Sequence, residues 1–234
     1  MRMPPELAER ARALVYGGDW TAPEPRPAST VVLLRDGVAG VEVALLQRAA
    51  NLGFARGMYV FPGGALDVAD AELGDPWLVA AVRETFEECG VLLTDPAPPA
   101  AAFADRQRDF GSLLAEFELK PDLAALHPFA HWVTPEVESR RFDTRFFAAA
   151  LPAGQDLADF TTEHQNVGWF DPAAIDGLPM LPPTTAALAD IARFDTVAEA
   201  LAEHRSPIPI MPKPLPADGD ITWVLVNAVT GEPL

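Results

Sequence analysis

Residues 75–90 form a predicted helix whose two ends are both marked in the sequence. Asp75 is a favourable N-cap residue, and Pro76 suits the first helical position, where its missing N–H has no helical partner to lose. Gly90 suits the C-terminal stop, because glycine adopts the left-handed conformation without strain. Any fold of this chain therefore has to accommodate a helix of about residues 76–89.

This helix has one carboxylate face and one apolar face. At about 100° per residue, Glu84, Glu87 and Glu88 fall within one arc. The opposite side carries Val79, Val82 and Phe86. Like charges three or four residues apart repel by a few tenths of a kcal/mol, and Arg83 cannot neutralise three carboxylates. Two interpretations follow: a solvated surface face, or a site for a divalent cation such as Mg²⁺, which prefers oxygen ligands.

The composition of the chain limits its partners. Among 234 residues, 34 acidic and 17 basic side chains give a formal charge of −17, which disfavours nucleic acid as a partner. The apolar runs are far shorter than the roughly 18 to 20 residues that cross a bilayer, and the first residues lack the apolar core of a secretory signal. We therefore expect no membrane partner, and the single cysteine favours the cytoplasm.

The rest of the chain alternates strand and helix patterns. We predict an N-terminal helix over 6–15 and a linker to residue 27, followed by one domain over 28–234. Two β-branched, aliphatic runs, 30–35 and 41–47, flank a turn and predict a hairpin. Further strands are predicted at 128–134, 142–150, 164–170 and 221–229, with an extended segment over 206–216. Further helices are predicted at 101–118, 172–176, 184–193 and 196–204.

The segment from Gly64 to Val91 resembles the Nudix box, the signature G-x5-E-x7-R-E-U-x-E-E-x-G-U, in which U is a bulky aliphatic residue. The stretch "RETFEECGV" matches the second half of this signature, R-E-U-x-E-E-x-G-U. The matching residues are Arg83, Glu84, Glu87, Glu88, Gly90 and Val91. The resemblance implies the Nudix fold of the α/β class, a mixed β-sheet sandwiched between helices. To this the chain adds an N-terminal helix and a C-terminal extension.

Two positions depart from the signature. Asp70 stands where the family has its first glutamate, and twelve residues instead of seven separate it from Arg83. The loop before the helix therefore carries an insertion of about five residues, which is inexpensive in free energy, and the resemblance assigns no role to Asp70. Thr85 replaces an aliphatic residue. Neither change removes a helix glutamate.

In the family, the helix glutamates hold Mg²⁺ or Mn²⁺ against a diphosphate, the arginine orients one of them, and a further glutamate often acts as base. The resemblance thus implies Glu84, Glu87 and Glu88 as metal ligands. For the base we favour Glu163, which precedes the strand ending in Trp169, with Glu136 and Glu138 as competitors. His164 next to it is either a base, a phosphate ligand or a solvated side chain, and Cys89 is expected to pack.

Three stretches, beginning at residues 45, 131 and 182, resemble the Nudix branch that contains the peroxisomal coenzyme A diphosphatases and bacterial relatives. This branch implies cleavage of coenzyme A or acyl-coenzyme A to 3′,5′-ADP and 4′-phosphopantetheine or its acyl form. The rival substrates are ADP-ribose, NADH and nucleotide sugars. A rival class is a non-catalytic regulatory domain that binds a nucleotide.

The predicted substrate-binding residues combine glycines for close backbone approach with arginines for phosphate. They are Gly63, Gly64, Arg48, Arg141 and Arg145. In a strand, Arg141 and Arg145 would share one face and Arg140 would lie on the other. A salt bridge to Asp143 or Glu138 is the alternative for either arginine. The expected partner is a small nucleoside diphosphate derivative, with a second copy of the chain as a further candidate.

Overall fold

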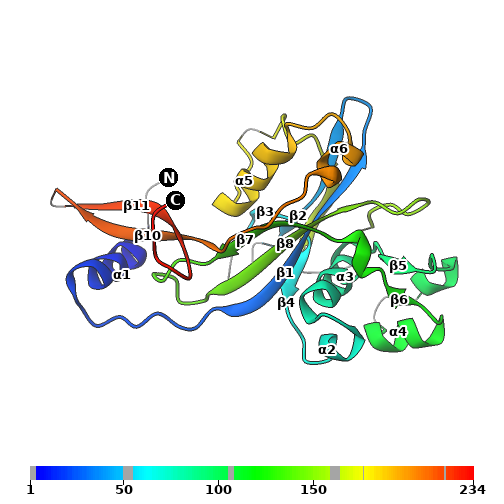
Figure 1. Cartoon of the computed structure of the whole chain (residues 1–234), viewed down its shortest axis with the longest axis horizontal. Helices are drawn as coiled ribbons and strands as arrows, with labels where there is room; N and C mark the ends of the chain where they lie inside the picture. The colour runs from blue at the N-terminus through cyan, green and yellow to red at the C-terminus, as the bar shows by residue number, and fades with distance from the viewer. Residues whose placement is uncertain (1–3, 50–54, 105–107, 159–163, 176, 219) are drawn as a thin grey trace. The chain divides into compact units, whose positions relative to one another are not determined.

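The computed structural model describes residues 4–49, 55–104, 108–158, 164–175, 177–218 and 220–234. The chain divides into two compact units. Unit 1 consists of residues 1–27, 130–144 and 207–234, and unit 2 consists of residues 28–129 and 145–206 (Figure 1). The predicted division into 1–27 and 28–234 stays a prediction, and the segment from Pro207 onward groups with the N-terminal segment.

Unit 2 is built around a sheet in the order β8-β1-β2-β3. Its strands are β1 (Arg26–Asp36), β2 (Val41–Arg48), β3 (Tyr59–Val60), β4 (Gly63–Ala65), β8 (Phe142–Ala150) and β9 (His164–Phe170). The predicted hairpin is confirmed, because β1 and β2 pair antiparallel with Leu34 opposite Val43. In addition, β9 pairs with β2, and β4 pairs with β1.

The central strands are buried on both faces. Residues 31–34 of β1 and 43–46 of β2 are all 0% exposed, so apolar side chains on both sides of the pleat are covered. Helix α3 (Pro76–Cys89) packs on one face, and α5 (Pro182–Ile191) and α6 (Val197–Ala202) lie on the other (Figure 1). The predicted sandwich of a sheet between helices is confirmed.

Helix α3 has the bounds that its sequence predicts. Asp75 accepts hydrogen bonds from the backbone N–H groups of Trp77 and Leu78, and Gly90 adopts φ 71° and donates to the Phe86 carbonyl. The apolar face packs into the main core with β1 and β2, through Val79, Val82 and Phe86. The carboxylate face is thereby turned away from that core.

The remaining elements of unit 2 are short. They are α2 (Asp70–Leu73), β5 (Thr94–Asp95), the 3-10 turns η1 (Ala100–Phe103) and η2 (Leu123–Ala125), α4 (Phe110–Glu116) and β6 (Lys120–Pro121). The predicted helix over 101–118 is confirmed over Phe110–Glu116 and wrong as one continuous helix. The 3-10 turn η1 ends at Phe103, and α4 begins after Asp109, whose carboxylate accepts a hydrogen bond from the Ser112 backbone N–H. The predicted helix over 172–176 is also wrong over 172–175, where Asp171 accepts from Ala173 N and forms a turn.

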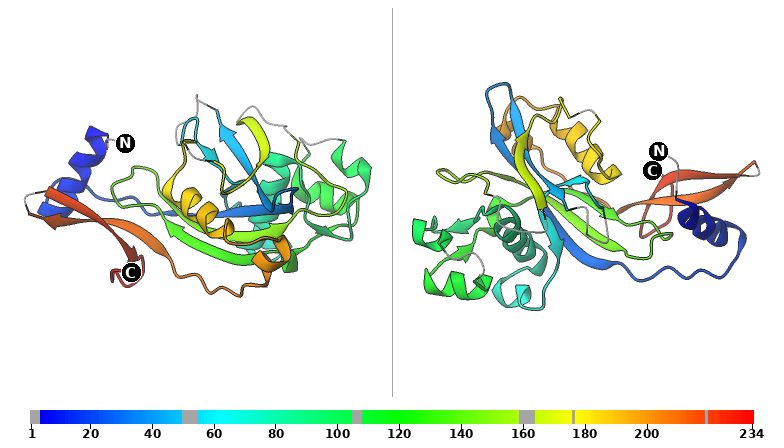
Figure 2. Two further views of the ribbon diagram at one scale, coloured as in Figure 1. Left: turned by 90° about the horizontal axis from the view of Figure 1, so that it is seen from above. Right: turned by 180° about the vertical axis from the view of Figure 1, so that it is seen from behind.

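Unit 1 combines a helix with a hairpin. Its elements are α1 (Pro5–Tyr16), the end of β7 (His127–Val133), β10 (Ile210–Ala217) and β11 (Asp220–Asn227). The last two strands pair antiparallel, and Ile210 lies parallel to Trp132 of β7. Figure 2 shows α1 beside this hairpin, where the Tyr16 hydroxyl donates to the Asp220 carbonyl. The predicted N-terminal helix is confirmed, and the predicted C-terminal extension contains β10 and β11.

Across the described ranges, every helix is too short or too polar to pass through a lipid bilayer.

Candidate active site

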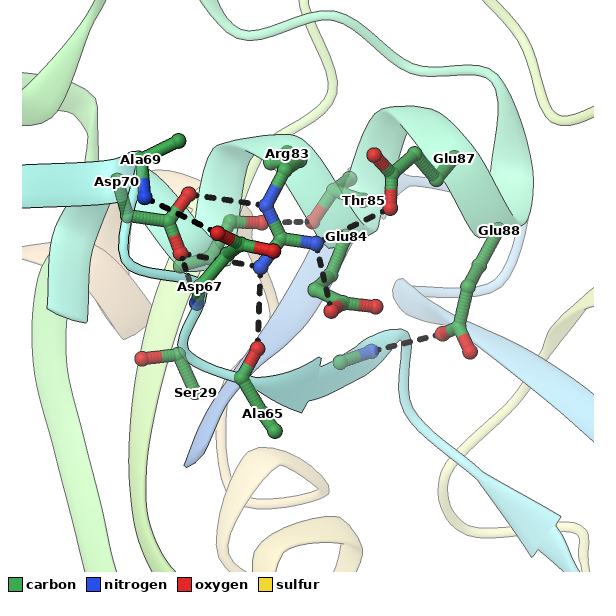
Figure 3. Close-up of polar contacts among 12 residues, drawn as sticks. Ser29, Ala65, Asp67, Ala69, Asp70, Arg83, Glu84, Thr85, Glu87 and Glu88 are labelled. Carbon is green, nitrogen blue, oxygen red and sulfur yellow. Dashed lines mark hydrogen bonds and ion pairs between the residues drawn. The ribbon is translucent and has the colours of Figure 1, made fainter. Parts of the chain in front are cut away.

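Strand β4 brings the double glycine against the carboxylate face of α3. The Gly63 backbone N–H donates to Glu88 Oε2 over 2.8 Å (Figure 3). A Cβ atom on Gly64 would lie 2.5 Å from the Glu84 carboxylate. The absence of a side chain at residue 64 is therefore what allows the Glu84 carboxylate to lie over this strand.

Arg83 donates hydrogen bonds to three acidic side chains next to the carboxylate face of α3. Its Nε and Nη2 donate to the two oxygens of Asp70 over 2.9 and 3.0 Å. Nη1 donates to Glu84 Oε1 over 2.8 Å and to Glu87 Oε2 over 3.1 Å, and Nη2 also donates to the Ala65 carbonyl over 3.0 Å (Figure 3). These contacts use all five N–H donors of the guanidinium.

Burial makes these carboxylates costly to ionise. It raises the pKa of Glu84 to about 7, although the positive charge of Arg83 acts in the opposite direction. Burial also raises the pKa of Glu87. For Arg83, burial lowers the pKa, but the hydrogen bond to Asp70 and the charge of Glu84 outweigh it and leave the pKa raised. An additional positive charge here would lower the free energy of the ionised glutamates.

The acidic side chains are held by protein donors and do not form a ready coordination shell. Within the described ranges, no three His, Cys, Asp or Glu side chains are gathered closely enough to hold a metal ion. Glu84 and Glu87 accept from Arg83, and Glu88 accepts from Gly63. The carboxylate oxygens of these glutamates nevertheless lie along one side of α3, next to the backbone of Gly63 and Gly64. Carboxylate oxygen is the type of ligand that Mg²⁺ and Mn²⁺ prefer.

Asp70 is the residue whose contact with Arg83 sequence reasoning missed. It is 2% exposed, and both oxygens of its carboxylate accept hydrogen bonds from Arg83. The signal was present, since Asp70 stands at the position of the first glutamate of the signature, six residues after Gly64. The insertion between Asp70 and Arg83 hid it, because spacing along the chain does not reveal that α2 returns Asp70 to the helix.

Two of the three predicted phosphate-binding arginines, Arg141 and Arg145, have different surroundings. Arg145, on β8, is exposed, and its guanidinium lies 4.0 Å from the centre of the Trp77 ring in unit 2. Arg141 is 8% exposed and donates to the carbonyls of Thr134 and Pro23 in unit 1. It precedes β8, so the expectation that it shares a strand face with Arg145 is wrong. Their roles in binding stay predictions.

The structure describes only some of the candidate general bases. Glu163 lies outside the described residues. The backbone of His164, the first residue of β9, is paired with Arg48 at the end of β2. Glu136 and Glu138 lie in unit 1, and burial raises the pKa of Glu138.

Cys89 is buried at the end of α3, and its thiol donates to the Thr85 carbonyl. Burial raises its pKa to about 12, so the side chain is a neutral thiol that packs, as predicted.

The double glycine yields a paired prediction for stability. A Cβ on Gly63 would lie 2.4 Å from the Ser29 backbone oxygen, whereas the three atoms nearest to a Cβ on Gly64 all belong to the carboxyl group of Glu84. We expect Gly63→Ala to lower the free energy of unfolding by about 1–3 kcal/mol, and Gly64→Ala to lower it by less than about 1 kcal/mol. Urea unfolding of both variants measures this difference, and equal losses would contradict it.

Comparisons with known proteins agree with this arrangement. The family model described as the NUDT19 Nudix domain matches residues 75–178. Human acyl-coenzyme A diphosphatase NUDT19 is 29% identical over 68% of this chain and 61% of its own length. The putative nudix hydrolase 7 of Caenorhabditis elegans is 30% identical over 76% of this chain and 65% of its own. The chain therefore spans less than two thirds of either relative.

A solved structure extends the match to the fold. The NUDIX hydrolase of Alicyclobacillus acidocaldarius superposes with a TM-score of 0.70 and 28% identity, over 77% of this chain and 97% of the other. The matched family model starts at the N-cap of α3 and includes Arg83, Glu84, Glu87 and Glu88. Together with the helix–sheet sandwich and the double glycine beside the carboxylate face, these matches place the chain in the Nudix hydrolase superfamily.

Proposed function

We propose that this chain is a metal-dependent diphosphatase that hydrolyses a nucleoside diphosphate derivative, with coenzyme A or an acyl-coenzyme A as the first candidate substrate. The observation that carries the proposal is the carboxylate face of α3 lying against the side-chain-free backbone of Gly63 and Gly64. The name of the human relative, an acyl-coenzyme A diphosphatase, supports this choice of substrate.

The residues around α3 have separate roles in this proposal. Glu84, Glu87 and Glu88 would hold Mg²⁺ or Mn²⁺, and Nudix hydrolases generally use such ions. A bound divalent ion neutralises the diphosphate and lowers the pKa of water. The backbone at Gly63 and Gly64 lets the diphosphate approach the glutamates closely.

The proposed reaction is a hydrolysis of one P–O–P bond. Water adds to one phosphorus, the bridging P–O bond breaks, and each phosphate leaves as a monoester. Glu163 is the proposed acceptor of the proton from water. With coenzyme A the products are 3′,5′-ADP and 4′-phosphopantetheine, and an acyl group would stay on the latter.

Arg145 is the proposed contact for the 3′-phosphate that distinguishes coenzyme A from ADP-ribose and NADH. It is exposed and has an aromatic ring at 4.0 Å that orients its planar guanidinium. Arg141 and Arg48 remain further candidates, although two backbone carbonyls already accept from Arg141.

Comparing substrates tests this proposal. We expect wild type to cleave coenzyme A faster than dephospho-coenzyme A, and Arg145→Ala to reduce that preference by about 10-fold, since hydrogen bonds to charged groups contribute about 1.5–3 kcal/mol. Chromatography of the products measures both rates. Arg140→Ala, which removes another exposed arginine, is the matched control and should keep the preference. Equal rates on both compounds in wild type would contradict recognition of the 3′-phosphate.

The same assay separates the rival functions. Faster cleavage of ADP-ribose, NADH or a nucleotide sugar would replace coenzyme A as substrate. Nucleotide binding without cleavage of any of these compounds would favour the non-catalytic regulatory domain. A cytoplasmic location and self-association stay predictions for fractionation and for light scattering.

A further inference from the structure

We propose that Trp77 is a specificity-determining positioning residue, which holds the Arg145 guanidinium so that its N–H donors face a phosphate group of the substrate. This inference rests on the proposed function, because it assumes that Arg145 contacts the 3′-phosphate. It assigns a role to Trp77, in the first turn of α3. It also explains how an exposed arginine discriminates between two ligands that differ by a single phosphate.

The first step is the position of Trp77 beside the double glycine. The hydroxyl of Ser29, which is fully buried, donates a hydrogen bond of 2.6 Å to the Trp77 carbonyl. Ser29 lies on β1, directly opposite Gly64 of β4. Trp77 therefore lies over the strand next to the backbone of Gly63 and Gly64, where the diphosphate is proposed to bind.

The second step is the fixed position of the tryptophan. The Asp75 carboxylate accepts a hydrogen bond of 2.9 Å from the Trp77 backbone N–H. Together with the contact from Ser29, this bond engages the N–H and the carbonyl of Trp77. The ring packs against the main hydrophobic core of unit 2. The indole is therefore a rigid surface for a group that lies on it.

The third step is the orientation of the Arg145 guanidinium. Strand β8, which carries Arg145, pairs with β1 on the other side from β4, so it runs about 10 Å from the double glycine. The guanidinium carbon lies 4.0 Å from the centre of the Trp77 ring. This contact occupies one face of the guanidinium, whereas its N–H donors lie in the plane and point outward. The stack therefore fixes the plane and leaves the donors available for a two-point contact with phosphate.

The fourth step is a comparison with another arginine that lies over a tryptophan in unit 2. The guanidinium carbon of Arg35 lies 4.4 Å from the centre of the Trp169 ring, and its Nε donates to Glu42 over 2.6 Å. For Arg145, no residue within the described ranges accepts a hydrogen bond from the guanidinium or pairs with its charge. In a chain with a net charge of −17, this arginine therefore remains available to an anionic ligand.

Binding of 3′,5′-ADP and 5′-AMP to the full chain tests this inference. The two ligands differ only in the 3′-phosphate, so the ratio of their dissociation constants, measured by calorimetric titration, isolates its recognition. In Trp77→Leu we expect the preference for 3′,5′-ADP to fall by about 3- to 10-fold, as expected for loss of a cation–π contact at a partly exposed site. Trp77→Phe keeps an aromatic face and should lose less. A purely structural role of Trp77 would leave this ratio unchanged.

Turnover and a double variant show whether Trp77 acts through Arg145. In Trp77→Leu the KM for coenzyme A should rise with little change in kcat, because a contact made equally in the ground state and the transition state is weakened. The KM for dephospho-coenzyme A should stay as in wild type. In an Arg145→Ala background, Trp77→Leu should lower the preference for 3′,5′-ADP no further.

Trp169→Leu is the matched control. Trp169 lies in the same unit and also has an arginine over its ring, so the same substitution removes a comparable stack. We expect its preference for 3′,5′-ADP to equal that of wild type. If Trp77→Leu does not fold, Trp77→Met takes its place with the same expected loss, because methionine fills irregular apolar space without a ring.

The outcomes are distinct. A wild-type preference in Trp77→Leu, together with a lowered preference in Arg145→Ala, would overturn the role of Trp77 and leave the proposed function intact. An equal fall in Trp169→Leu, or a further fall in the double variant, would also overturn it. A lowered preference in Trp77→Leu, with no hydrolysis of any diphosphate by wild type, would support the positioning role and overturn the proposed function. If wild type binds both ligands equally, recognition of the 3′-phosphate and the role of Trp77 both fail.

Discussion

Glu87→Gln and Glu88→Gln are each expected to lower the turnover of coenzyme A by about 10²- to 10³-fold or more, because removing one charge of the proposed metal site withdraws several kcal/mol of transition-state stabilisation. Glutamine keeps an oxygen that accepts a hydrogen bond, so the contact from Gly63 to residue 88 remains available. The fold should therefore persist. Turnover at limiting Mg²⁺, with circular dichroism of each variant, measures the two effects separately.

Glu84→Gln extends this prediction to stability. Because burial raises the pKa of Glu84 to about 7, the folded state favours the protonated form. The stabilising contribution of protonated Glu84 is fully present below the pKa of the unfolded chain, near 4.5. This contribution is lost as the pH rises through the folded-state pKa of about 7. Without metal at pH 8, Glu84→Gln should thus be at least as stable as wild type, while its turnover falls.

A surface glutamate provides the control for all three variants. Glu72, on α2, is exposed, and Glu72→Gln should leave turnover unchanged. Near wild-type turnover of both Glu87→Gln and Glu88→Gln at limiting Mg²⁺ would rule out the metal-binding role of these residues.

Arg83→Ala should show the largest loss of stability, about 3–5 kcal/mol of unfolding free energy, because it leaves a buried charge without its partner. The charge is that of Asp70, which is 2% exposed, and Glu84, at 15%, loses a partner as well. Activity should fall with it, through misplaced glutamates. Urea unfolding at pH 8 measures the loss.

Two further variants give this prediction its controls. Arg193→Ala removes an arginine whose side chain is 56% exposed, so its loss should stay below about 1 kcal/mol. Combining Arg83→Ala with Asp70→Ala should recover part of the stability, since the most deeply buried of the carboxylates that lose Arg83 is then removed. A loss of less than about 1 kcal/mol in Arg83→Ala would show that Asp70 does not depend on this pair.

Elements with local signals were predictable from the sequence. Asp75, Pro76 and Gly90 act within one turn of the helix, and α3 has the predicted bounds. The bounds of β8 and β9 were also as predicted, 142–150 and 164–170. The helix predicted over 101–118 was right only over Phe110–Glu116, because the Asp109 carboxylate caps a new helix start there, and periodicity does not reveal such a start.

In the candidate site, too, residues on one helix were predictable and contacts between distant segments were not. Glu84, Glu87 and Glu88 share a face because they lie on one helix with a fixed period, and the sequence was sufficient to group them. The pairing of Asp70 with Arg83 joins two helices across an insertion, and the burial of Arg141 depends on Pro23, 118 residues away. Contacts of this kind form when two distant segments bury their surfaces against each other, and the local sequence does not specify which segments do so. Helix spacing therefore identified the carboxylates, and packing across the chain decided that Arg83 pairs with Asp70 and that Arg141 is buried.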